Sequence, residues 1–203
     1  MNDGQMIQIT GWAAYVSAAA SIIGFITIII FFMIGQPWGS INDFTGSVVL
    51  GLSVIFLVWG LHSLMPARQP ALNTLALVIG IIGGLGMAVA GAAVLLKTFG
   101  VITFPEPRPG SGPYGLGTYA PMVLGAWLIL FNGLALTGGK LPSVLSWIGV
   151  AAGIGFVVTL IGFISSGPES PITAIGGLLT AIGYPVWAIW LGRLLLGGKL
   201  PLG

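Results

Sequence analysis

The sequence predicts an all-α polytopic membrane protein, with six transmembrane helices packed into one compact bundle. Hydrophobic residues make up 56% of the 203-residue chain and charged residues only 5%, whereas soluble domains carry about 25% charge. The mean hydropathy is +1.08. Six apolar stretches are separated by charged residues or by Pro and Gly. Each stretch reaches the roughly 20 residues that a membrane-spanning helix needs.

We expect all six stretches to be helical. A backbone in hydrocarbon must satisfy its own hydrogen bonds, and no stretch shows the alternation of a barrel strand. The chain is therefore expected to form a single domain, 1–203, with spans at about 12–34, 45–65, 72–96, 117–137, 143–165 and 171–194.

Charge placement predicts how the bundle is oriented. Six spans put both termini on one side of the membrane, and cytoplasmic loops carry an excess of Lys and Arg. The side with the termini holds four basic residues, Arg68, Lys140, Arg193 and Lys199. The other side holds Lys97 and Arg108. Both termini are therefore predicted to be cytoplasmic.

A short repeat suggests that the bundle consists of three tandem helical hairpins. Residues 132–142 and 191–201 both finish with Gly-Gly-Lys-Leu-Pro, at the end of spans that run from the outer to the inner side. Gly ends a helix, Lys meets the negative end of the helix dipole, and Pro prevents the helix from continuing.

Small residues at helical spacing are expected to hold the bundle together, because close backbone approach drives helix association in lipid. They are Gly80, Gly84, Ala88, Ala92, Gly149, Gly153, Gly177 and Ala181. The alternative is that these faces bind other membrane subunits or a second copy. The lipid bilayer is the other expected partner. No basic run is present that would bind nucleic acid.

The sequence offers little reactive chemistry. No Asp, Glu, Lys or Arg lies in the central third of any predicted span, which argues against a proton relay or a charged ion pathway. The chain has no Cys and no recognisable nucleotide-binding or hydrolase motif. Three outer-loop acids, Asp43, Glu106 and Glu169, and one His do not make a zinc site. We therefore expect no catalytic residue, no metal and no cofactor.

Two sets of residues are candidate binding sites. His62, Asn132 and Arg193 lie at related depths on three parallel spans, where they could form an inner-leaflet pocket for a phosphate or lipid head group. The alternative is that Arg193 snorkels while the other two bond locally.

The second set surrounds a predicted kink. Pro185 lies near the middle of the sixth span, beside Thr180 and Tyr184. A helix-interior Pro removes a hydrogen bond, so this kink could shape a pocket for a neutral molecule. Pro is also common in membrane helices without any such role.

The outer segment 98–116 is expected to be either a lid over the bundle or an extended connector. Its stretch 104–114 contains four Pro, and we expect it to form no regular helix.

Residues 141–155 and 184–192 resemble a broad group of small bacterial six-helix membrane proteins, catalogued as domains of unknown function. The shared feature is a Leu-Pro-x-x-Leu-x-x-x-Gly turn before the fifth span. The resemblance covers mainly the C-terminal third. It implies a bacterial inner-membrane protein, but no activity and no site residue.

These observations favour a non-catalytic accessory or scaffold protein. One alternative is a carrier or channel for a small neutral or apolar molecule, which requires a cavity that reaches Thr180 and Tyr184. The other is a lipid-modifying enzyme at the inner leaflet, which requires His62, Asn132 and Arg193 to face one cleft.

Overall fold

The computed structural model describes residues 2–64, 69–103, 112–167 and 169–200, and these form helices and turns without any strand. The elements are α1 (Asp3–Ile34), α2 (Trp38–Asn42), a π-helix η1 (Asp43–Val49), α3 (Leu50–Leu64), α4 (Pro70–Thr98), α5 (Gly112–Gly138), α6 (Ser143–Ser166) and α7 (Pro171–Leu196). Within these ranges, six helices are long and apolar enough to cross a membrane, with α2, η1 and α3 counting as one. The predicted all-α bundle is confirmed.

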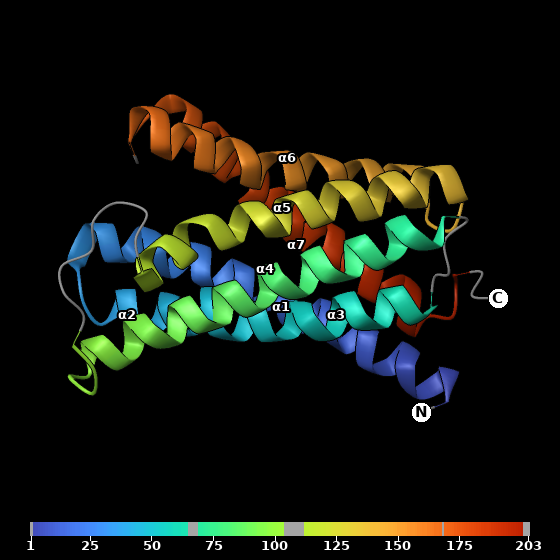
Figure 1. Ribbon diagram of the computed structural model, residues 1–203, viewed down its shortest axis with the longest axis horizontal. Helices are drawn as coiled ribbons and strands as arrows, with labels where there is room; N and C mark the ends of the chain where they lie inside the picture. Colours follow the sequence, from blue (N-terminus) through green and yellow to red (C-terminus); the bar gives the residue numbers. More distant parts are fainter. Residues whose placement is uncertain (1, 65–68, 104–111, 168, 201–203) are drawn as a thin grey trace.

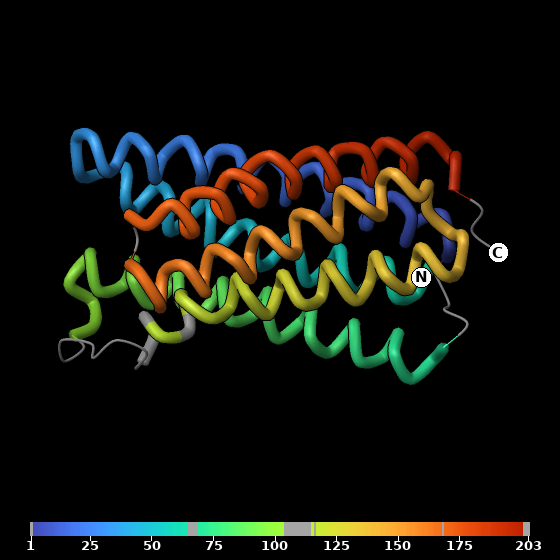
Figure 2. The backbone as a smooth tube through the Cα atoms, turned by 90° about the horizontal axis from the view of Figure 1, so that it is seen from above, coloured from blue at the N-terminus to red at the C-terminus, as the bar shows by residue number. Residues whose placement is uncertain are grey.

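The helices follow one another around a closed ring. Each long helix packs on its neighbours in the sequence, and α7 returns to pack on α1. The ring runs up and down, so α1 begins and α7 ends at the same end of the bundle (Figures 1 and 2). We call this the terminal end and the opposite one the distal end. Three consecutive hairpins, α1–α3, α4–α5 and α6–α7, therefore make up the ring.

Two helix boundaries in the first third of the chain differ markedly from the predicted ones. Helix α1 begins at Asp3 rather than near residue 12, because Asn2 and Gln5 form a capping box that supports a polar first turn. The predicted loop 35–44 is already helical from Trp38 onward. The length of an apolar stretch reveals only the apolar part of a helix. Where a helix continues into polar residues, the predicted boundary therefore lies inside the true one.

Helix α5 corrects the expectation for segment 104–114. It begins at Gly112, so Pro113 is its second residue. Proline is tolerated there because the first N–H groups of a helix have no acceptor within the helix. Residues 104–111 lie outside the described ranges. Whether segment 98–116 is a lid or a connector therefore stays a prediction.

Glycines bring the helices into close contact within the chain. A Cβ atom on Gly84 would lie 2.8 Å from the carbonyl oxygen of Gly51, across the α3–α4 contact. A Cβ on Gly153 would lie 2.7 Å from the carbonyl oxygen of Gly125, across the α5–α6 contact. Both pairs let backbones touch, as small residues do between helices in lipid. Gly84 and Gly153 therefore pack inside this bundle.

Candidate functional site

From mid-length toward the terminal end, the bundle interior contains a group of buried rings that we call the aromatic cluster: Trp127, Phe131, Phe156, Tyr184 and Trp187. The two indoles meet edge to face with their centroids 5.9 Å apart, the geometry that ring quadrupoles favour. Trp127, Tyr184 and Trp187 are almost completely buried. Helices α5, α6 and α7 together supply this cluster.

A buried amide fixes the position of Trp187. The indole Nε1–H of Trp187 donates a hydrogen bond of 3.0 Å to Oδ1 of Asn132, and Nδ2 of Asn132 donates one of 2.8 Å to the carbonyl oxygen of Leu128. Gly149 faces the amide so closely that a Cβ there would overlap it. The pairing satisfies two polar groups that would otherwise be costly to bury.

The distal half is hollow. A cavity of about 440 Å³, which we call the distal cavity, is lined by residues from every long helix of the ring. Much of its wall is apolar, including Phe25, Phe156, Leu160 and Phe163. Neutral polar side chains supply the rest: Ser21, Asn42, Ser47, Thr118, Thr159 and Thr180. None of the described residues that line it is charged.

The cavity exists because the α6–α7 hairpin is attached tightly along only part of its length. Near the terminal end, a Cβ on Gly192 of α7 would lie 3.0 Å from the carbonyl oxygen of Gly11 of α1. The close Gly125–Gly153 contact joins the hairpin to α5 near mid-length. Beyond these contacts the hairpin rises away from the other helices toward the distal end (Figure 1), and the distal cavity occupies this space.

On the opposite side of the cavity, α1, η1 and α4 remain in close contact toward the distal end. A Cβ on Gly24 of α1 would lie 2.7 Å from the Cα of Gly46 in η1. A Cβ on Gly91 of α4 would lie 2.7 Å from the carbonyl oxygen of Asp43. These contacts continue the packing of α1, η1 and α4, so the interior widens on the side of the α6–α7 hairpin.

The residues around the predicted kink lie at the floor of this cavity. Thr180 lines it, whereas Tyr184 lies one turn deeper and contacts Phe156 of the wall, with ring centroids 6.1 Å apart. Within the described part of the chain, the buried Thr180 hydroxyl has no hydrogen-bond partner. The buried Tyr184 hydroxyl lies near the hydroxyl of Ser17. Pro185 is buried next to Tyr184 and is not among the lining residues.

The residues of the predicted inner-leaflet pocket lie in different surroundings. The side chain of Asn132 is fully buried and engaged by Trp187. Arg193 is exposed on α7, and His62 is partly buried near the end of α3. A pocket common to all three stays a prediction.

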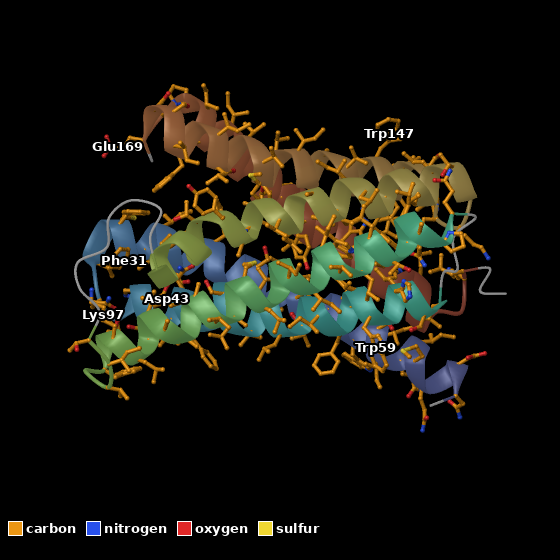
Figure 3. The ribbon with its side chains drawn as sticks, in the orientation of Figure 1. Phe31, Asp43, Trp59, Lys97, Trp147 and Glu169 are labelled. Atoms are coloured by element: carbon orange, nitrogen blue, oxygen red, sulfur yellow. The ribbon has the colours of Figure 1, made fainter. Side chains whose placement is uncertain are left out.

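Two of the three outer-loop acids can be placed. Asp43 and Glu169 lie at the distal end, as does Lys97, whereas Trp59 and Trp147 point outward from the sides of the bundle (Figure 3). Glu106 lies outside the described residues. Across those residues there is no group of three or more His, Cys, Asp or Glu side chains suited to a metal ion.

Sequence reasoning missed most of the polar lining, notably Asn42, Ser47, Thr118 and Thr159. Three of the four are Ser or Thr, and a hydroxyl in a membrane helix usually bonds to its own preceding turn, as Thr159 does to the carbonyl of Gly155. The available signal was their common depth, since all four occur toward the distal end of their helices.

No family model, curated protein or solved structure matches this chain.

Proposed function

We propose that the chain is a carrier or binding protein for a small, neutral, largely apolar molecule, which it holds in the distal cavity. The observation that carries this proposal is a cavity of about 440 Å³ without a charged residue among its described lining. Ligand sites span roughly 300–1,000 Å³ and combine apolar walls with a few polar groups. An ion would lack the compensating charge that a dry interior requires.

The aromatic cluster favours a binding site that is closed at one end, rather than a channel through the bundle. Phe156 and Tyr184 close the floor of the cavity, and Trp127 and Trp187 fill the interior beyond it. A ligand would therefore enter and leave through the distal half.

We propose that the bundle lies in a bacterial cytoplasmic membrane with both termini inside. The exposed apolar side chains support a lipid environment: Phe32 is 76% and Met33 77% exposed, an arrangement unfavourable in water. Basic residues at the terminal end, Lys140, Arg193 and Lys199, support this orientation. The distal cavity then opens toward the outer leaflet.

Photolabelling in proteoliposomes tests the proposal. A diazirine-bearing octanol serves as a small neutral probe, and labelled residues are mapped by peptide mass spectrometry. Gly177 lines the cavity, and a Cβ atom there would have no neighbour within 4 Å, so Gly177→Phe is chosen to place a ring in the cavity from an open position. Gly133→Phe is the matched control, because Gly133 is equally open but lies outside the cavity lining.

We expect saturable labelling of cavity residues such as Met87 and Phe163, competed by excess octanol. Gly177→Phe should remove most of this labelling and Gly133→Phe should leave it unchanged. Labelling that is confined to lipid-facing residues such as Ile182, without competition, would contradict a binding function and favour the inert scaffold. Loss of labelling in both variants would point to a general change of the bundle and would equally refute the assignment to this cavity.

A further inference from the structure

A second hollow lies on the outside of α7, near the terminal end. It is a groove of about 550 Å³ lined by Val186, Ile189, Trp190, Arg193, Leu194 and Lys199. The first five follow the pattern i, i+3, i+4, i+7 and i+8 along the helix, so they share one face of α7. We call this feature the α7 groove. It is apolar along most of its length and carries two cations toward its terminal end.

The Gly-Gly turn after α7 places Lys199 beside this face. Gly198 has a φ of +61°, a conformation that glycine adopts without strain. The chain therefore reverses, and the backbone N–H groups of Gly198 and Lys199 bond to the carbonyl oxygens of Leu195 and Leu194, at 3.1 and 3.0 Å. These bonds also satisfy carbonyl groups at the helix end.

Both cations of the groove are available to a ligand. Arg193 and Lys199 are exposed, and neither side chain has an ion pair or hydrogen bond with any residue in the described ranges. Trp190 lies one turn before Leu194, and an indole near basic residues is typical of the boundary between lipid tails and head groups.

We propose that the α7 groove binds one anionic glycerophospholipid. Its phosphate would lie between Arg193 and Lys199, and an acyl chain would run along Val186 and Ile189. A guanidinium and an ammonium complement a phosphate, and basic pockets on membrane helices bind anionic head groups. The apolar remainder of the groove selects a lipid over free phosphate. This proposal rests on a membrane setting but not on any ligand in the distal cavity.

The internal repeat provides a matched control. The same Gly-Gly-Lys-Leu-Pro turn follows α5, where Lys140 corresponds to Lys199. At the position of Arg193, however, α5 has Leu134. Lys140 therefore has the turn and the charge without the paired guanidinium.

The test is titration of the purified full-length chain in neutral detergent with phosphatidylglycerol or phosphatidylcholine, with bound lipid counted by native mass spectrometry. Removing one cation from such a site weakens binding by about fivefold. We expect Arg193→Gln and Lys199→Gln each to weaken phosphatidylglycerol binding by about fivefold, and the double variant by about 25-fold. Arg193→Lys should retain most of the affinity, and Lys140→Gln all of it.

The lipid source and the fold are checked in the same experiment. Phosphatidylcholine binding should be weaker and unaffected by the substitutions, and inorganic phosphate should not compete below millimolar concentrations. Equal melting temperatures of the variants exclude unfolding as the cause. The proposal is refuted if the double variant binds phosphatidylglycerol like the native chain, if Lys140→Gln weakens binding equally, or if free phosphate displaces the lipid.

Discussion

Replacing Trp187 by Phe tests whether the buried Asn132–Trp187 hydrogen bond organises the packed half of the bundle. The substitution removes part of a fully buried ring and leaves Oδ1 of Asn132 without its donor. We expect about 1 kcal/mol from lost packing and about 1 kcal/mol from the unpaired oxygen, or about 2 kcal/mol in all. Asn132 is itself fully buried, so bulk water does not reach its Oδ1 in the native structure.

A matched substitution separates these two contributions. Trp127→Phe removes the same atoms from an equally buried ring of the aromatic cluster, but Trp127 does not bond to Asn132. It should cost about 1 kcal/mol, from packing alone. In a double-mutant cycle, Asn132→Leu and Trp187→Phe should show a coupling of about 1 kcal/mol, within the range of hydrogen bonds between membrane helices.

Unfolding by SDS in mild detergent, followed by far-UV circular dichroism, measures these free energies without relying on the altered tryptophans. A coupling near zero, together with equal destabilisation by Trp187→Phe and Trp127→Phe, would refute the reasoning. The indole would then be held by shape alone.

Two further predictions concern packing and orientation. Gly84→Ala should lower the melting temperature in detergent, because its Cβ would lie 2.8 Å from a facing carbonyl oxygen, whereas Gly177→Ala meets open space and should be neutral or stabilising by up to ~1 kcal/mol; a reversed order would contradict the close helix contact. The native chain has no Cys, so Glu169→Cys and Ser143→Cys each introduce a single thiol. An impermeant maleimide should label the Glu169→Cys thiol in intact cells and the Ser143→Cys thiol only after permeabilisation, and the opposite pattern would invert the proposed topology.

The fold was predictable because lipid imposes one strong rule on the backbone. Uncharged stretches of sufficient length must be helices, and the ends of α4, α6 and α7 fall within a few residues of the predicted spans. The start of α1 was not predictable in this way. Its first turns contain polar residues, and their support comes from the Asn2–Gln5 capping box rather than from hydropathy.

The candidate site was predictable only in part. The polar residues Thr180 and Tyr184 close to Pro185 predicted a pocket, and Thr180 lies in the cavity wall. The hollow itself depends on how far the α6–α7 hairpin separates from α1 and α5, which is set by contacts between distant residues such as Gly11 and Gly192. Spacing along one helix carries no information about such distances.

The same limit applies to Arg193. Its depth suggested a partnership with His62 and Asn132, because the three spans run in the same direction. That pocket stays a prediction, and the turn at Gly198 also brings Lys199 to the same face of α7. The position of Lys199 depends on a local reversal of the chain, which the depth of a residue along its helix does not predict.

Under the proposed binding function, the partial attachment of the α6–α7 hairpin also bears on ligand selectivity. A tilt of the hairpin would turn about its close glycine contacts near mid-length, so its atoms would move farther with increasing distance from them. The floor beside Phe156 should therefore be rigid and discriminate sharply by size, whereas the mouth should accept groups of varied bulk. A series of neutral compounds that share one end and branch at the other should reveal this gradient.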